Sequence, residues 1–541
     1  MSQKVQRLRE MYVADALESI AMNGDSYTDE DTLYRICCQS KPRLSRDLFH
    51  RDMTLLLQKE LLCQEGRRIY LPQTLKYENS AAMFLADILL YNDLPEVVLP
   101  DSLVVAGITL SQDQRSAVSM ALSHRLSIIL GGAGSGKTTL ISALLQYSSG
   151  GSYSVLCAPT GKAAVNLYSR IGEPARTVHS ALGKLPNDDF INGSVDWHFT
   201  DLVVIDEASM MTLEMLAGIL KSARSRCRIV LIGDPNQLQA VGSGNVMPDL
   251  INLGIPNVQL SHSYRQDDST SALYQNVVGF SSCHTLEDLK FDDSFTLIPG
   301  TSDSHVKQVI CEAGIRLYEK NADVQILSPV NSAGELSKNQ LNLELQESLV
   351  PFQEGIDIPG LPIHGGDRIM ILKNDWNNGV CNGDTGRVYL CHLNSHLLGI
   401  GVICDRGPCP VWRGDSFLPY LSLAYAITVH KSQGSEYGTV IFPLSRRYSH
   451  VLTRNLLYTA ISRAKKRVIL VGEPEVLNVA LQKMPSKRKS MLIQKTHMCL
   501  ESIRTKGENH VLSYTQHHLC TGHGSSSFGV SEQRNYSGKA L

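Results

Sequence analysis

The stretch SIILGGAGSGKTTLISALLQ, residues 127–146, decides how the first large domain of this chain folds. Its apolar start predicts a strand, and the apolar spacing after the glycines predicts an amphipathic helix. Between them lie Gly131, four further residues, and then Gly136, Lys137 and Thr138. Such a loop lets backbone N–H groups point at phosphate oxygens, while the lysine reaches the β and γ phosphates and the threonine hydroxyl ligates Mg²⁺. The stretch therefore predicts a nucleoside triphosphate site.

The whole loop would hold the nucleotide, because successive backbone groups surround the phosphates. Lys137 is also a predicted catalytic residue and Thr138 a predicted metal ligand. The nucleotide-binding residues predicted from this stretch are Gly131, Gly132, Ala133, Gly134, Ser135, Gly136, Lys137, Thr138 and Thr139.

Two further apolar runs end in polar residues that belong at the same edge of a parallel sheet. DLVVIDEASM places Asp206 and Glu207 directly after one run, and RIVLIGDP leads to Gln237 after another. Asp206 can hold the metal through its water shell, and Glu207 can orient and deprotonate an attacking water. The Gln237 amide can sense the γ-phosphate by hydrogen bonding. These residues predict an ATP or GTP hydrolase.

Two arginines are candidates for stabilising the charge of the transition state. Arg265 lies in SYRQ, and Arg463 lies in LLYTAISRAKKRVILVG between an apolar helix face and a strand. A guanidinium that reaches across to the γ-phosphate would also register closure of two domains. Taken singly, each arginine also fits a surface ion pair.

Composition sets outer bounds on the function. The chain has 541 residues and 43% hydrophobic content, and at about 150 residues per domain this predicts three to four domains. A net charge of −2 removes the simple argument that a strongly basic protein binds nucleic acid, although residues 463–506 hold eleven basic against three acidic side chains.

No apolar run approaches the roughly 18 residues of a membrane span, and thirteen cysteines without a CxxC pair suit a reducing compartment. We expect a cytoplasmic protein without a membrane partner.

Short apolar strands alternate with helical segments over most of the chain, which predicts an α/β fold with parallel sheets. An N-terminal run of three helices and a hairpin resembles a winged helix, with DNA contact and partner docking as alternative roles. The expected domains are 1–80 (winged-helix-like), 81–255 (first α/β domain), 256–349 with 421–506 (second α/β domain), 350–420 (small β insertion) and 507–541 (disordered tail).

An ordered set of motifs carries a resemblance to a known family. With the stretches above, the chain resembles the RecD-like branch of superfamily 1 helicases over about residues 60–500. The further motifs are LSQDQRSAV (110–118), APTGKAA (158–164), TVHSALG (177–183), LIGDPNQLQAVGSG (231–244), YAITVHKSQGSEY (425–437) and YTAISRAK (458–465).

The resemblance implies two RecA-like motor domains, with ATP and Mg²⁺ in the cleft between them. It assigns Gln114 to the adenine edge and Glu436 to the ribose. Gln237, Arg265 and Arg463 would contact the γ-phosphate, and Asp206 with Glu207 would serve metal binding and general-base catalysis.

The resemblance also implies single-stranded DNA running across both motor domains. The residues that it places near the strand are Thr160, His179, Thr428 and His430. Hydroxyl and imidazole groups suit a sugar-phosphate backbone, which they bind without reading bases. An SH3-like insertion at 350–420 would help to enclose the strand. Residues 183–200 would form a strand-separating pin with Trp197 or Phe190 at the fork, and an ordinary surface loop is the alternative.

We therefore expect an ATP-dependent DNA helicase that moves 5′ to 3′ on single-stranded DNA, separates forked duplex DNA and serves repair or recombination. Only about 100 residues precede Leu110, fewer than in many RecD-like helicases that act alone. An alternative is therefore a nucleotide-gated DNA-binding ATPase subunit of a larger helicase and nuclease complex. An RNA helicase is a third possibility that the motor motifs leave open.

Overall fold

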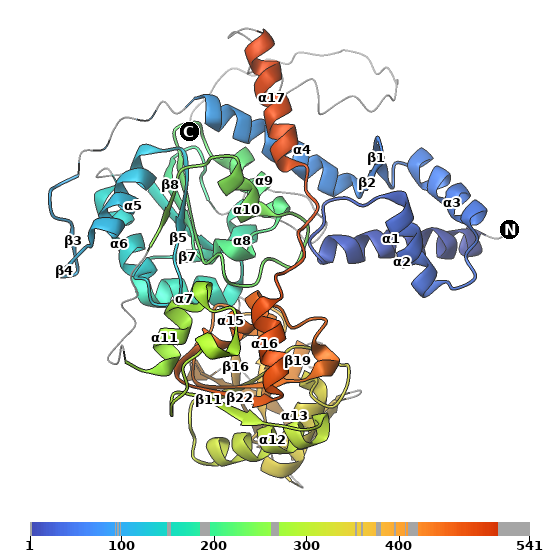
Figure 1. Cartoon of the computed structure of the whole chain (residues 1–541), viewed down its shortest axis with the longest axis vertical. Helices are drawn as coiled ribbons and strands as arrows, with labels where there is room; N and C mark the ends of the chain where they lie inside the picture. The colour runs from blue at the N-terminus through green and yellow to red at the C-terminus, as the bar shows by residue number, and fades with distance from the viewer. Residues whose placement is uncertain are drawn as a thin grey trace, which may run out of the picture.

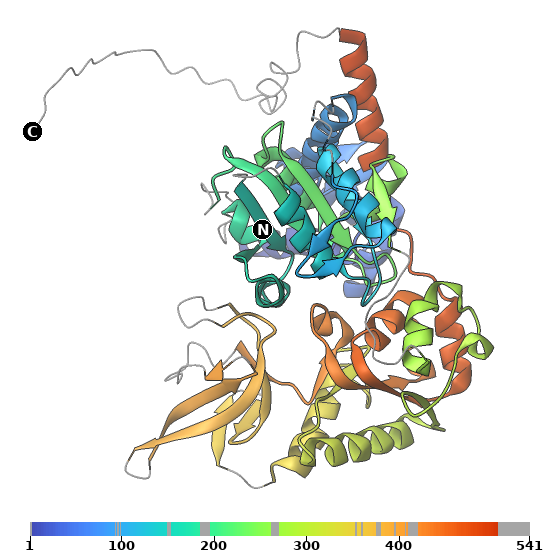
Figure 2. The same cartoon turned by 90° about the vertical axis from the view of Figure 1, so that its left-hand side faces the viewer.

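The computed structural model describes residues 3–91, 94, 97, 99–148, 153–183, 195–260, 270–351, 354–358, 361–374, 380–393, 396–405, 407, 408 and 420–506. Two α/β domains lie one above the other, and a helical N-terminal unit adjoins the upper one (Figures 1 and 2). Across these residues, no helix combines the length and apolar character needed to cross a membrane.

The upper α/β body, called domain 1, is built on a six-stranded sheet in which every strand pair is parallel. The strand order is β10-β5-β9-β8-β6-β7, so the chain crosses over the sheet between strands. The strands are β5 (Leu126–Leu130), β6 (Tyr153–Ala158), β7 (Ala175–Thr177), β8 (Thr200–Ile205), β9 (Arg228–Gly233) and β10 (Asn257–Gln259).

Helices cover both faces of this sheet, as alternating strands and helices predict. One face packs against α5 (Gln112–Ser123), α6 (Lys137–Tyr147) and α7 (Gly161–Ile171). The other face packs against α8 (Val178–Leu182), α9 (Leu213–Ser222) and α10 (Val246–Asn252). A small hairpin of β3 (Val104–Val105) and β4 (Ile108–Thr109) precedes α5. This arrangement brings the carboxyl ends of the strands to one edge, where ligands bind in open parallel sheets.

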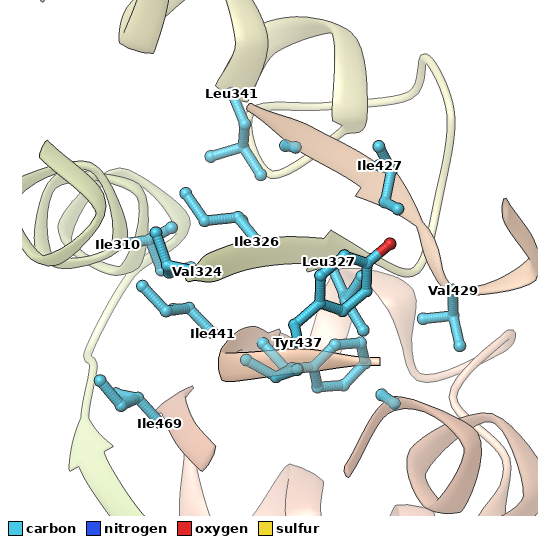
Figure 3. Close-up of a cluster of buried hydrophobic side chains, with 14 of the residues drawn as sticks. Ile310, Val324, Ile326, Leu327, Leu341, Ile427, Val429, Tyr437, Ile441 and Ile469 are labelled. Atoms are coloured by element: carbon cyan, nitrogen blue, oxygen red, sulfur yellow. The ribbon is translucent and has the colours of Figure 1, made fainter. Parts of the chain in front are cut away.

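The lower body, called domain 2, has a second parallel sheet of order β11-β22-β21-β12-β20. Its core is apolar on both faces of the sheet, and Figure 3 shows Ile326, Ile441 and Ile469 on neighbouring strands within it. The strands are β11 (Phe295–Pro299), β12 (Val324–Ser328), β20 (Ala426–Thr428), β21 (Tyr437–Leu444) and β22 (Ala464–Gly472). The helices are α11 (Ala272–Val278), α12 (Asp303–Glu319), α13 (Lys338–Leu349), α14 (Val429–Ser432), α15 (Arg454–Ile461) and α16 (Pro474–Gln482).

A small β unit is inserted between α13 and β20 and extends to one side of domain 2 (Figure 2). It contains a five-stranded antiparallel sheet of order β18-β17-β16-β15-β19 and a separate hairpin, β13-β14. Its SH3-like character stays a prediction. The strands are β13 (Gly355–Ile358), β14 (Leu361–His364), β15 (Arg368–Ile371), β16 (Thr385–Leu393), β17 (His396–Cys404), β18 (Gly407–Pro408) and β19 (Leu421–Leu423).

The N-terminal unit has the element order that the sequence predicts, three helices and then a hairpin. They are α1 (Gln3–Met22), α2 (Glu30–Ser40), α3 (Arg46–Gln58), β1 (Cys63–Glu65) and β2 (Arg68–Tyr70). Asp29 and Ser45 cap α2 and α3 by accepting backbone N–H groups, which fixes where these helices begin. The winged-helix assignment itself stays a prediction.

Two long helices cross the expected domain boundaries. Helix α4 (Pro72–Leu90) continues through residue 80 and packs its alanine face on the core of domain 1. Helix α17 (Leu492–Lys506) was expected with domain 2, yet it lies beside α4 (Figure 1), and Leu492 joins the core of domain 1. The chain therefore returns to domain 1 after completing domain 2.

A buried ion pair joins these two helices. Glu78 on α4 is fully buried, and its Oε2 lies 3.5 Å from Lys495 Nζ on α17. Lys495 also contacts Glu65 at 2.9 Å and Asn79 at 2.6 Å. The lysine therefore neutralises a carboxylate that has no access to water.

We expect Lys495→Met to lower the free energy of unfolding by about 3 kcal/mol, because it leaves the Glu78 charge buried without a counter-ion. Urea unfolding followed by circular dichroism measures the change. Arg504→Gln, which removes an exposed charge from the same helix, is the control and should be close to neutral. Equal stability of the two variants would contradict this account of the α4–α17 contact.

Candidate nucleotide site and DNA-facing residues

The glycine-rich loop between β5 and α6 has the geometry of a phosphate cradle. Gly136 precedes α6 with φ +79°, a left-handed conformation that lets the backbone curl into the helix. Lys137 Nζ donates to the carbonyl oxygens of Gly131 and Gly132, both at 2.8 Å. The lysine thus lies over the loop, and its bonds are to groups that an anion would replace.

Asp206 and Glu207 follow β8 at the same sheet edge. Removal from water, together with the neighbouring Glu207, raises the pKa of Asp206 to about 6, while Lys137 opposes this rise. The backbone N–H of Glu207 donates to Asp206 Oδ1 at 2.9 Å. Glu207 has φ +53°, which is strained for a residue with a side chain and recurs at functional sites. The hard oxygens of Thr138 and Asp206 suit Mg²⁺, which would neutralise phosphate charge.

The loop after β9 forms a buried polar cluster with domain 2. Asp234 is 1% exposed, and its Oδ2 accepts the Tyr458 hydroxyl at 2.8 Å and the Gln237 amide at 3.4 Å. Burial raises the pKa of Asp234, and burial with Asp234 raises that of Tyr458. Among the described residues, Gln237 Oε1 is buried with no hydrogen-bond partner. An unpaired buried acceptor beside a phosphate cradle fits a site that awaits a polar ligand.

Tyr458 also reaches the phosphate loop. A side chain added at Gly132 would lie 3.2 Å from the Tyr458 hydroxyl, and the backbone N–H of Ala133 lowers the tyrosine's pKa by hydrogen bonding. Helix α15 of domain 2 therefore places the Tyr458 side chain against the phosphate loop of domain 1.

Further hydrogen bonds join the same loop to domain 2. The N–H of Leu238 donates to Thr459 Oγ1 at 2.8 Å, and Gln433 Nε2 donates to the Leu238 carbonyl at 3.0 Å. Asn455 donates to the carbonyl of Gln237 at 3.0 Å. Residues 234–238 are consequently held from both sides of the cleft.

Arg463 lies behind Tyr458 and is 4% exposed. Its guanidinium donates to the carbonyls of Thr459 and Ser435, both at 3.3 Å, and to the Ser462 hydroxyl at 3.2 Å. Its charge lowers the pKa of Tyr458, so the two side chains are neighbours. The structure thus brings Arg463 to the cleft and rules out the surface ion pair that its sequence position also allowed.

Helix α7 faces domain 2 with a stripe of residues spaced four apart. Lys162 donates to the Gly383 carbonyl at 3.1 Å, Asn166 donates to the Gly434 carbonyl, and Arg170 pairs with Glu436 at 3.1 Å. This spacing places all three side chains on one helix face. Beside the stripe lies a cavity of about 550 Å³, with walls from domain 1, domain 2 and the β insertion.

Two expected nucleotide contacts are already engaged. The Gln114 carboxamide oxygen accepts the Ser111 N–H at 3.1 Å and closes a capping box at the start of α5. Glu436 pairs with Arg170 and lies 3.8 Å from Lys465. Its expected ribose contact would therefore compete with Arg170 for the carboxylate.

Three of the expected DNA-facing residues lie at helix starts next to the cleft. Thr160 caps α7 and Thr428 caps α14, each by accepting a backbone N–H. Both helices adjoin the loop of the β insertion that ends at Gly383, and His430 is exposed beside it. His179 lies half-buried in α8 of domain 1.

Two sequence predictions fall on residues that the structure does not describe. Arg265 lies outside the described residues, and so does most of the expected pin, including Phe190. Trp197 is described, and it packs against the core of domain 1.

Sequence reasoning missed two residues of the cleft. Tyr458 stands inside the YTAISRAK motif, but an apolar helix pattern surrounds it and gives its hydroxyl no separate signal. Arg170 lies ten residues after Thr160. Its charge opposes the rise in the pKa of Asp206 that burial causes, and its nearness to Asp206 depends on the direction of α7.

Two parallel-sheet domains that close over a phosphate loop, with acidic and amide groups at the strand ends, define a P-loop motor ATPase. Family comparison agrees: the AAA domain matches residues 109–288, and the UvrD-like helicase C-terminal domain matches residues 423–471. The RecBCD enzyme subunit RecD of Mycolicibacterium smegmatis is 30% identical over 416 residues, which are 69% of this chain and 73% of that protein. The chain belongs to the RecD-like family of superfamily 1 helicases.

Another relative is the ATP-dependent RecD2 DNA helicase of Deinococcus radiodurans, 31% identical over 456 residues and 84% of this chain. The match covers 61% of that relative's own length. Among solved structures, Bacteroides Pif1 bound to single-stranded DNA is 20% identical, with 74% of this chain and 97% of that chain covered and a TM-score of 0.45. Candida albicans Pif1 is 17% identical, with 74% and 100% covered and a TM-score of 0.44.

We expect Tyr458→Phe to lower the kcat of ATP hydrolysis about tenfold, because a hydrogen bond to a buried charge contributes about 1.5–3 kcal/mol. Nucleotide binding should persist, since the phosphate loop is intact. Steady-state ATPase and fluorescent-nucleotide titration measure the two effects.

Tyr448→Phe is the matched control, because Tyr448 is equally buried and its hydroxyl donates to Ala333 within domain 2. Hydrolysis by Tyr458→Phe at the wild-type rate would refute a role for the cross-cleft bond.

Proposed function

We propose that the chain is an ATP-dependent DNA helicase that moves along single-stranded DNA and separates duplex DNA. The observation that carries the proposal is the Tyr458–Asp234 hydrogen bond, which ties domain 2 to the phosphate side of domain 1. Any movement of Asp234 therefore alters the contact between the two domains. Cycling two strand-binding domains between closed and open states produces stepping.

Hydrolysis would use residues at the strand ends of domain 1. Lys137 and the loop N–H groups hold the phosphates, and Thr138 with Asp206 hold Mg²⁺, which when bound neutralises developing charge. Glu207 takes the proton of the attacking water, and Gln237 uses its unpaired oxygen or its amide to position that water.

Domain 2 would complete the site on closure. Arg463, and Arg265 by the family resemblance, stabilise the transition-state charge. Gln114 recognises the adenine edge and Glu436 the ribose. Because Glu436 pairs with Arg170 in this structure, its move to the ribose would break a contact across the cleft.

DNA as the substrate is supported by the name of the Deinococcus radiodurans relative, a DNA helicase. Movement from 5′ to 3′ and a cytoplasmic role in repair or recombination follow from the family resemblance. Thr160, Thr428 and His430, beside the β insertion, would hold the strand by its backbone, and His179 would contact it in domain 1.

A second candidate is a nucleotide-gated ATPase subunit of a larger complex. The Mycolicibacterium smegmatis relative, named as a subunit of the RecBCD enzyme, favours it. In that case other helicase or nuclease subunits would be partners of this chain.

Lys137→Ala should abolish DNA-stimulated ATP hydrolysis and strand separation while leaving the fold intact, because it removes the phosphate contact and, within the protein, the two bonds of the lysine to its own loop. Hydrolysis and forked-duplex assays test this, with circular dichroism as the check on folding. Lys221→Ala, an exposed lysine on α9, serves as the control. Full unwinding by Lys137→Ala would overturn the mechanism.

Forks that carry either a 5′ or a 3′ single-stranded tail test polarity and self-sufficiency together. We expect the purified chain to separate 5′-tailed DNA forks and to leave 3′-tailed forks paired. ATPase stimulation without separation would favour the subunit alternative, and equal activity on matched RNA forks would contradict DNA specificity.

A further inference from the structure

Three distant segments meet in one junction beside the nucleotide site. The first is the loop 22–29 after α1, and the second is the loop 240–244, which follows Gln237. The third is the segment 488–489, on the connection that returns from domain 2 to α17 (Figure 1). Each belongs to a different part of the fold, so the junction joins the N-terminal unit to both α/β domains.

Arg488 is the centre of this junction. Its Nη1 donates to the carbonyls of Gly244 at 2.9 Å and Gly242 at 3.3 Å, and its Nη2 donates to the Ala240 carbonyl at 2.5 Å. Burial lowers the pKa of Arg488. Three carbonyls of one loop thus bind a half-buried cation, which makes the contact costly to lose.

The N-terminal unit also binds loop 240–244, through two backbone hydrogen bonds. The N–H of Gly244 donates to the Gly24 carbonyl at 2.9 Å, and the N–H of Gly242 donates to the Met22 carbonyl at 3.3 Å. Lys489 continues the contact: its N–H donates to Asp25 Oδ1 at 2.7 Å, and its Nζ pairs with Asp29 at 3.0 Å.

Gly24 shows how closely the segments fit. Its φ of +105° favours glycine, and a Cβ there would lie 2.2 Å from Arg488 Nε. A side chain at this position would therefore displace the guanidinium.

The loop that Arg488 holds continues the catalytic segment. Ala240 lies three residues after Gln237, and Arg488, Asp234 and Gln237 line one small cavity of about 60 Å³. The cavity leaves space into which the loop can shift if its anchor is removed. A shift of about 1 Å in a positioning group can cost up to 10²-fold in rate.

We propose that Arg488 is a positioning residue that fixes loop 240–244, and with it Asp234 and Gln237, against the docked N-terminal unit. The N-terminal unit thereby sets the geometry of ATP hydrolysis without touching the nucleotide. This inference rests on the proposed ATPase function.

The experiment compares the full chain with Arg488→Gln and, as a charge-matched control, Lys487→Gln, which alters the exposed neighbouring residue. We expect Arg488→Gln to lower kcat about tenfold and to leave KM for ATP within about twofold, because the phosphate loop is untouched. Lys487→Gln should match the wild type.

Gly24→Ala supplies an independent route to the same loss, since it displaces Arg488 from the opposite segment. We expect it to reproduce the split between kcat and KM. A merely structural role would lower the folded fraction of both variants and leave kcat per folded molecule unchanged, which would overturn the proposal.

Amide hydrogen exchange tests the junction apart from catalysis. In Arg488→Gln, the amides of Gly242 and Gly244 should exchange about tenfold faster than in Lys487→Gln, as expected for losing one charge-assisted hydrogen bond. Unchanged exchange would overturn the inference even if the chain is a helicase. Faster exchange in a chain without DNA-stimulated ATPase would support the junction and count against the proposed function.

Discussion

The hydrogen bond from the Tyr458 hydroxyl to the buried Asp234 carboxylate ties the arrangement of the two α/β domains to the nucleotide site. A carboxylate with 1% exposure is costly unless its oxygens are paired. The N–H of Asn236 and the Gln237 amide supply partners from domain 1, and Tyr458 supplies the one from domain 2. Opening the cleft at this point therefore leaves a buried charge underpaired, and closing it places α15 over the phosphate loop.

The parts of the site that could be predicted from sequence are those in which a buried strand ends in a polar residue. Asp206, Glu207 and Gln237 follow apolar runs, and parallel strands bring their carboxyl ends to one edge. Tyr458, Arg170 and the α4–α17 packing could not be predicted this way. Their partners lie far along the chain. The spacing of apolar residues shows which helix face is buried, but it does not show which domain that face packs against.

The basic C-terminal segment illustrates the same limit. Its excess of positive charge is a local count, whereas three of its basic side chains bind partners elsewhere in the protein. Lys495 neutralises Glu78, Lys489 pairs with Asp29, and Arg488 binds three carbonyls. Each partner precedes it in the sequence by more than 200 residues, so residues 488–495 of this segment connect domain 1 and the N-terminal unit.

Helix α7 links the two ends of the predicted reaction. Thr160 caps it beside the β insertion, and Arg170, near its other end, pairs with Glu436 and slightly opposes the rise in the pKa of Asp206 that burial causes. Eleven helical residues span about 16 Å, which is the distance between its two ends. In the proposed cycle, a move of Glu436 away from Arg170 would release one end of the helix face that also carries Asn166 and Lys162. The helix therefore connects the residue that pairs with Glu436 to the surface expected to hold DNA.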